Sequence, residues 1–302
     1  MSRQISTLIG FTAVLMWAVL ALLTAASGTM PPFELAAITF LIGGLIGAVT
    51  WPFRPHALHA LKQRPIVWLV GIGGLFGYHA VYFSALRSAP AIEASLIAYL
   101  WPLLLVVFSA LSPGEKLRLH HGAGVILGLL GAFLVITKGE HLSFVNGLRP
   151  GHGLALVCAV IWAAYSVISR RFGDVPSDAV AGFCLVTAVL AALCHFAFEE
   201  TVWPTQMSEV FAMIGLGFFP VGAAFYVWDH GVKHGDIMVL GAASYASPLL
   251  STLVLVGAGY AAYHWSVLVA CVMITCGALL AAKDLVFQRS PSHDHGRDVA
   301  SK

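Results

Sequence analysis

The amino-acid sequence predicts an all-α integral membrane protein with ten transmembrane helices, which form two inverted five-helix repeats and leave both termini in the cytoplasm. Three observations predict this fold class: the composition, the spacing of the apolar runs, and a repetition inside the chain. Of the 302 residues, 59% are hydrophobic and 10% are charged, and the mean hydropathy is +0.87. A soluble domain carries about 25% charged residues, so this composition excludes a water-soluble globular protein.

Ten apolar runs follow one another, each bounded by polar or charged residues. A helix needs about 20 apolar residues to cross a bilayer, and the runs lack the short alternating pattern of barrel strands. Lipid tails cannot form hydrogen bonds with backbone N–H and C=O groups, so these groups must pair within the segment. We therefore expect each run to be a helix. The runs cover residues 5–27, 32–52, 65–86, 91–111, 120–137, 151–169, 178–198, 208–230, 236–257 and 265–282.

The basic residues predict the orientation of the chain. With the N-terminus inside, 13 of the 16 Lys and Arg residues fall on the inner side, and only Arg87, Lys138 and Arg149 fall outside. The positive-inside rule therefore predicts two cytoplasmic termini. The first run is too long for the core of a signal peptide, so we retain it as a helix. The polar tail 290–302 is expected to be disordered.

The chain repeats itself after 146 residues. The segment Tyr99-Leu-Trp-Pro102-Leu-Leu reappears as Tyr245-Ala-Ser-Pro248-Leu-Leu at that offset. The same offset relates other pairs of equivalent residues in the two halves. One insertion or deletion near the start also aligns a pair of tryptophans. These pairs are Gly71 with Gly217, Arg87 with Lys233, Gly131 with Gly277, and Trp17 with Trp162 at 145 residues.

The two repeats cover residues 1–143 and 144–289, with five predicted spans each. Because five is odd, the second repeat starts on the opposite side of the membrane from the first. Apolar segments broken by proline at matching places in two such repeats point to the binding site of a secondary transporter.

Polar aromatic residues in the third span are the first candidates for that site. Tyr78 and Tyr82 are four residues apart and share one helix face with His79 beside them. They lie deeper than a belt of interfacial aromatics requires, so we expect them to line a substrate cavity. Polar contact between packed helices is the alternative.

The two proline motifs supply further candidates, Tyr99, Trp101 and Pro102 in one span and Ser244, Tyr245 and Pro248 in the other. A proline inside a helix cannot donate to the carbonyl four residues before it. The carbonyls of Ala98 and Ser244 are thus predicted to be free to accept a hydrogen bond from a substrate ammonium or a water. A bend with a purely structural role is the alternative.

Trp17 and Trp162 are predicted near the middle of the first and sixth spans, where each indole N–H needs an acceptor. They could form the bottom of the cavity, form a gate, or have a purely structural role in packing. A lining of this kind suits aromatic side chains and organic cations.

These residues resemble the EamA-type members of the drug/metabolite transporter superfamily. The resemblance rests on the five-plus-five plan, Trp17, Ala94-Ser95-Leu96 and Gly114-Glu115-Lys116, whereas Tyr260-Ala261 replaces the Gly-Glu pair in the second half. Tyr78-His79-x-x-Tyr82 and Tyr99-Leu-Trp-Pro102 are most similar to the YddG-type aromatic amino-acid exporters of the bacterial inner membrane. The resemblance implies export of aromatic and other apolar amino acids by alternating access.

The charged residues bear on how export is driven. Acids inside spans usually mark ion coupling, but the nearest candidates sit near span ends, which leaves His79 as the titratable group at depth. We expect the substrate gradient to drive export, with proton coupling through His79 as the alternative. The acids near span ends are Glu34, Glu93, Glu209, Asp229 and Asp236.

Other functions fit the residues less well. A broad drug or organic-cation exporter shares the aromatic lining, while a nucleotide-sugar carrier would need Lys or Arg facing the cavity. A membrane-embedded enzyme would need a nucleophile and base, and a channel would need a filter motif. The five cysteines lack metal-ligand spacing. We expect no metal, cofactor or nucleic-acid partner; the partners are amino acids and the lipid bilayer, and a monomer suffices.

Overall fold

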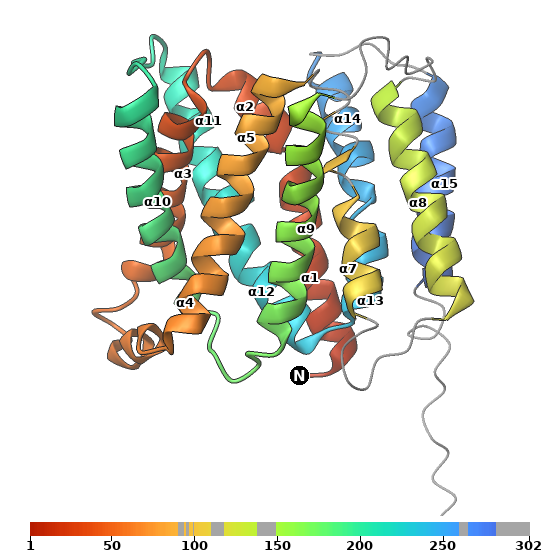
Figure 1. Ribbon diagram of the computed structural model, residues 1–302, viewed down its shortest axis with the longest axis horizontal. Helices are drawn as coiled ribbons and strands as arrows, with labels where there is room; N and C mark the ends of the chain where they lie inside the picture. Colours follow the sequence, from red (N-terminus) through yellow and green to blue (C-terminus); the bar gives the residue numbers. More distant parts are fainter. Residues whose placement is uncertain are drawn as a thin grey trace, which may run out of the picture.

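The computed structural model is a bundle of helices that run side by side (Figure 1). It describes residues 1–89, 94, 97, 98, 100–109, 118–137, 149–259 and 265–281, and within these residues every regular element is helical. The first part of the chain contains α1 (Arg3–Ala18), α2 (Leu20–Ala26), α3 (Pro32–Ala48), η1 (Pro55–Leu61), α4 (Pro65–Ile72), η2 (Gly73–Gly77), α5 (Tyr78–Ser88), α7 (Trp101–Ser109) and α8 (Leu119–Thr137).

The second part contains eight described elements, and both η2 and η3 are π-helices. These elements are α9 (Pro150–Arg170), α10 (Ala179–Phe198), α11 (Met207–Phe218), η3 (Phe219–Ala223), α12 (Ala224–His234), α13 (Ile237–Ala243), α14 (Ala246–Gly257) and α15 (Trp265–Ala281).

Among the described residues, five helical stretches have the length and apolarity needed to cross a membrane, and three further apolar helices are shorter. Together they make the chain a multi-pass membrane protein. The long stretches are Arg3–Ala26, Pro65–Ala85, Pro150–Arg170, Ala179–Phe198 and Met207–His234, and the shorter ones are Pro32–Ala48, Leu119–Gly131 and Leu268–Gly277.

The two remaining predicted runs, 91–111 and 236–257, do not appear as single helices in the described residues. In the first run the helix α7 begins at Trp101, and in the second run Ser244 and Tyr245 separate α13 from α14. Pro102 is the second residue of α7 and Pro248 the third residue of α14. A proline in the first turn of a helix costs no hydrogen bond, because the N–H groups there have no partner within the helix.

The order of elements repeats along the chain. The π-helices Gly73–Gly77 and Phe219–Ala223 lie 146 residues apart, and the following helices α5 and α12 begin and end at the same offset. Single π-turns inside α-helices are rare and occur often at functional sites. The offset seen in the sequence therefore joins equivalent turns of backbone.

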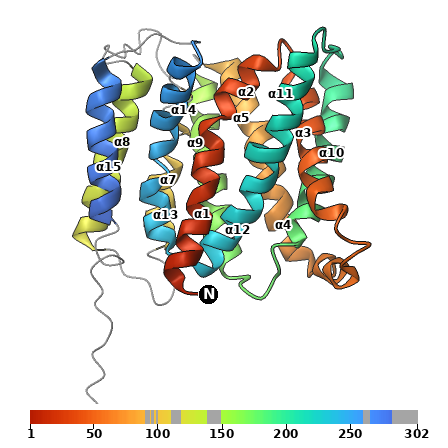
Figure 2. The same ribbon diagram turned by 180° about the vertical axis from the view of Figure 1, so that it is seen from behind.

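Helices from the two parts of the chain pack against each other throughout the bundle. The pair α8 and α15 lies at one end and the pair α3 and α10 at the other, as Figure 2 shows from behind. Between them, α1 packs on α12 and α5 packs on α9. The α1–α12 contact is close because glycines meet there: a Cβ atom on Gly10 would lie 2.8 Å from the Cα atom of Gly231.

Ion pairs also join the two parts. Arg3 lies 3.0 Å from Asp236, whose carboxylate caps the start of α13, and Arg54 lies 2.9 Å from Asp178 at the start of α10. Each pair links the first part of the chain to the start of a helix in the second part.

Candidate functional site

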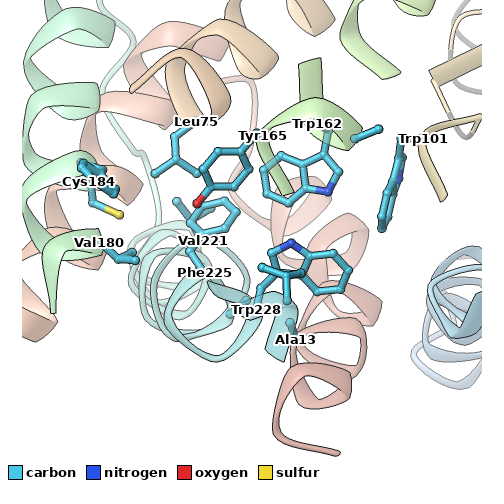
Figure 3. Packing of buried hydrophobic residues seen from close by; sticks show 14 of the residues in the cluster. Ala13, Leu75, Trp101, Trp162, Tyr165, Val180, Cys184, Val221, Phe225 and Trp228 are labelled. Atoms are coloured by element: carbon cyan, nitrogen blue, oxygen red, sulfur yellow. The ribbon is translucent and has the colours of Figure 1, made fainter. Parts of the chain in front are cut away.

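Rings from five helices meet in the middle of the bundle, and Figure 3 shows those of Trp101, Trp162, Tyr165, Phe225 and Trp228. The five helices are α1, α5, α7, α9 and α12, and so come from both parts of the chain. We call these residues the aromatic cluster: Trp17, Tyr78, His79, Tyr82, Trp101, Trp162, Tyr165, Phe225 and Trp228.

Trp17 of α1 lies in the middle of the aromatic cluster. Its ring centroid is 6.3 Å from that of Trp101, 5.8 Å from Trp162 and 5.1 Å from Trp228. These separations and their tilted or edge-on geometries are the ones that aromatic pairs prefer. The Trp17 indole N–H donates to the Pro220 carbonyl at 3.0 Å, so the π-helix η3 supplies the acceptor that a central tryptophan needs.

Tyr78 and Tyr82 form one side of the aromatic cluster. Their rings stack with centroids 5.8 Å apart and an interplanar angle of 15°, as residues four apart on one helix face can do. Tyr78 also lies 5.3 Å from Trp162. Both tyrosines are half-buried, so they keep accessible surface beside the tryptophans.

His79 has one ring nitrogen committed and one available. Its Nδ1 lies 2.7 Å from the Leu75 carbonyl oxygen in the π-helix η2. Since a carbonyl can only accept, Nδ1 carries the hydrogen and Nε2 is left as an acceptor. The ring is half-buried against Phe40 at 4.9 Å and Phe225 at 6.3 Å.

Trp101 and Trp162 complete the aromatic cluster. Their centroids are 6.3 Å apart with an interplanar angle of 83°, and their exposed fractions are 7% and 4%. Together with Trp17, Tyr78, His79 and Tyr82, they are the sequence-predicted residues that the structure brings to one place.

Ser244 and Tyr245 lie apart from the aromatic cluster, and both are fully buried. The Ser244 hydroxyl donates to the Leu240 carbonyl at 2.7 Å, and the Tyr245 hydroxyl accepts from the Leu103 N–H at 3.1 Å. Tyr245 thereby ties the start of α14 to the first turn of α7. Tyr99 lies outside the described residues.

The Ser244 carbonyl was predicted to be free, and this prediction is wrong. It accepts the Ser247 N–H at 3.0 Å. The prediction assumed one continuous helix with a proline inside it. The chain instead makes a tight turn at Ser244 and starts a new helix at Ala246, so a three-residue turn satisfies the carbonyl.

Phe225 and Phe40 were missed by sequence reasoning. Phe225 lies 146 residues after His79, so the repeat itself was the signal that could have placed it. Phe40, which stacks on Phe225 at 5.7 Å, has no such signal, because apolar residues facing protein and facing lipid look alike in the sequence.

A buried ion pair lies on the same helix as Trp228. Lys233 Nζ is 2.7 Å from Asp229 Oδ2, with exposed fractions of 3% and 2% for the two side chains. Ser177 donates to the same carboxylate oxygen at 2.6 Å, and Lys233 also donates to the Val175 carbonyl at 3.0 Å. The lysine charge is thus matched within the protein, which argues against Lys233 as a phosphate ligand.

Comparison with known proteins gives consistent results. The model of the EamA-like transporter family matches residues 4–137 and again residues 149–283. The chain is 53% identical to the aromatic amino acid exporter YddG of Ancylobacter novellus, over 93% of this chain and 98% of that protein. It is 27% identical to the protein of the same name from Escherichia coli, over 83% and 88% of the two chains. A crystal structure 53% identical in sequence superimposes with a TM-score of 0.88, covering 95% of this chain and all of that one.

Proposed function

This chain belongs to the EamA-like transporter family, and from that premise we propose that it exports amino acids, with aromatic and other apolar side chains favoured. It is a transporter and not an enzyme. The observation that carries the proposal is the aromatic cluster, in which rings from both family-matched segments surround half-buried tyrosine, histidine and tryptophan side chains. Export across a bacterial inner membrane is proposed because the two relatives named above are exporters from bacteria.

The aromatic cluster would bind the side chain of the substrate between rings. Flat faces of Trp17, Tyr78 and Tyr82 favour a stacked aromatic ring, and the same faces attract an ammonium group. The Nε2 atom of His79 would accept a hydrogen bond from a substrate indole N–H or phenol O–H. Phenylalanine lacks such a donor, so this contact would separate it from tryptophan and tyrosine.

The topology proposed for this function is ten transmembrane helices in two inverted repeats, 1–143 and 144–289, with both termini cytoplasmic and a disordered tail 290–302. Three findings support it: the family model matches twice, the π-helices recur at an offset of 146 residues, and equivalent helices such as α3 and α10 pack in pairs. Two related halves of opposite orientation can open alternately to either side.

The broken helices would move during this alternation. Tyr99, Pro102, Ser244, Tyr245 and Pro248 belong to that role, because the breaks fall where α7 and α14 begin. Ser244 and Tyr245 would act by holding these helices together and not by direct contact with a ring-shaped substrate, since their hydroxyls already bond within the protein.

We propose that the substrate gradient drives export. Asp229, a buried acid on the same helix as Trp228, is already paired with Lys233 and does not need a transported proton. Coupling of protons through His79 is the alternative. Efflux that is unchanged when the proton gradient is collapsed supports the first scheme, and efflux that stops supports the second.

Counterflow in proteoliposomes tests the function. Vesicles preloaded with unlabelled tryptophan should take up labelled tryptophan faster than empty vesicles, because a carrier exchanges substrate across the membrane. A panel of the twenty amino acids and several organic cations as competitors then separates an amino-acid exporter from a broad cation exporter. Absence of exchange with every aromatic amino acid would contradict the proposal.

A further inference from the structure

Two tryptophans of the aromatic cluster have an indole N–H group that donates to no atom of the described residues. Trp17, Trp68 and Trp228 each donate to a protein oxygen, at 3.0, 3.3 and 3.1 Å. Trp101 and Trp162 make no such bond within the part of the chain that the structure describes. Their nitrogens are also absent from the fully buried unpartnered polar atoms of those residues, so each nitrogen keeps accessible surface.

An unused donor in an apolar interior is costly. A polar group buried without a partner has a higher free energy than the same group in water. Both side chains are more than nine-tenths buried. The same bundle satisfies the other three indoles named above with a backbone carbonyl or a serine hydroxyl. None of the described residues supplies an acceptor for the two remaining donors, which leaves both N–H groups open to a bound ligand.

The two donors lie beside each other. The ring centroids of Trp101 and Trp162 are 6.3 Å apart and the rings are nearly perpendicular. In Figure 3 the indole nitrogen of Trp162 lies on the side of its ring that faces Trp101. The Trp101 ring is seen edge-on in this view. One small acceptor group between the rings could receive both hydrogens.

A carboxylate fits this arrangement. It offers two acceptor oxygens, and hydrogen bonds to an ionised acceptor are about twice as strong as neutral ones, more so where water is scarce. Neutral donors also suit a carrier, which must release its substrate. A buried Lys or Arg would bind the anion more tightly than a neutral indole N–H does and would slow that release. The ring faces of Trp17 and Tyr78 lie next to Trp162, and such faces attract an ammonium group.

We infer that the indole N–H groups of Trp101 and Trp162 bind the α-carboxylate of the transported amino acid. This inference rests on the proposed function, because it assigns one group of the same substrate to two atoms of the same site. The substrate side chain would then extend toward Tyr82 and His79 on the far side of Tyr78.

The test compares tryptophan with tryptamine, which lacks the carboxylate. Labelled tryptophan counterflow is measured with each compound as competitor, for the wild type and for Trp101→Phe and Trp162→Phe. The wild type should prefer tryptophan, and each variant should lower that preference by about tenfold, the loss expected for one hydrogen bond to a charged group. Trp68→Phe removes an indole N–H outside the cluster and should leave the preference unchanged.

An unchanged preference in both cluster variants, with transport retained, would overturn the carboxylate assignment and leave the exporter function standing. If a phenylalanine variant fails to insert, 3-benzothienylalanine at the same position replaces the N–H by sulfur within the same ring shape, and the same loss is expected. A wild type that exchanges no aromatic amino acid would instead remove the proposed function, and the carboxylate assignment with it.

Discussion

The two family-matched segments share a backbone plan but differ in their side chains. At an offset of 146 residues, Tyr78, His79 and Tyr82 of α5 correspond to Ala224, Phe225 and Trp228 of α12. The first segment thus supplies hydroxyls and an imidazole, while the second supplies apolar surface and a tryptophan whose N–H is bound by Ser166. Duplication preserved the geometry, and divergence divided the polar and apolar contacts between the two sides of one site.

The proline motifs show the same division. Trp101 precedes Pro102 in the first segment, and Ser247 stands at the equivalent place before Pro248. Trp101 reaches the aromatic cluster, whereas the matching segment ends in a compact turn closed by the Ser244 carbonyl. We therefore propose that the first segment makes most of the contacts with a substrate.

The largest expected effect comes from truncating the first-segment rings. Trp101→Ala, Tyr78→Ala and Tyr82→Ala should each lower tryptophan counterflow by at least about tenfold, because buried aromatic anchors dominate binding energy. Ser247→Ala, the counterpart of Trp101→Ala in the second segment, should stay close to the wild type. Normal transport by all three ring variants would show that the aromatic cluster does not bind the substrate.

A second large effect is expected on the stability of the folded protein, from a substitution in the second segment. Lys233→Met leaves Asp229 buried without its partner and should destabilise the protein by about 3–5 kcal/mol, measured as a loss of folded protein on heating in detergent. The first segment has Phe83 in place of Asp229. The double variant Asp229→Leu with Lys233→Met should therefore recover much of the loss, because it removes both charges. A double variant less stable than the single one would contradict this reasoning.

A smaller effect, on substrate preference, should follow His79→Phe, which gives the first segment the side chain of the second. The variant loses the Nε2 acceptor, so export of tryptophan and tyrosine should fall several-fold relative to phenylalanine, about the worth of one hydrogen bond. Competition among the three amino acids measures this ratio. Phe225→Leu is the control, since it changes the apolar wall and leaves the acceptor in place.

The smallest effect on transport is expected for Tyr245→Phe. The change removes the acceptor of the Leu103 N–H and should lower stability by about 1–3 kcal/mol, the cost of a buried donor left unpaired, while the ranking of substrates stays the same. Tyr226→Phe offers a comparison, because it removes a donor to the Gly43 carbonyl, which lies inside the helix α3 and keeps its helical partner. A change in substrate ranking with Tyr245→Phe would place Tyr245 in the binding site itself.

Much of this arrangement was predictable from the sequence. The offset of 146 residues gave the positions of equivalent elements, and the spacing of Tyr78 and Tyr82 gave a shared helix face that the structure shows. What could not be predicted were contacts between distant helices. Nothing near Trp17 in the sequence indicates that the Pro220 carbonyl accepts its N–H, because a π-turn leaves no pattern of residue types. Asp229 was placed near the end of a span, but its burial depends on Val175 and Ser177 folding over it.

The π-helices set the rotational register of the helices that follow them. A π-turn holds one residue more than an α-turn, and each residue turns an α-helix by about 100°. The turn at Gly73–Gly77 therefore decides which way α5 faces, and the turn at Phe219–Ala223 does the same for α12. Removal of one residue from either turn would rotate every later side chain of that helix by more than a quarter of a circle. The rings of Tyr78, His79 and Tyr82 would then point away from the tryptophans while the sequence of α5 itself stayed the same.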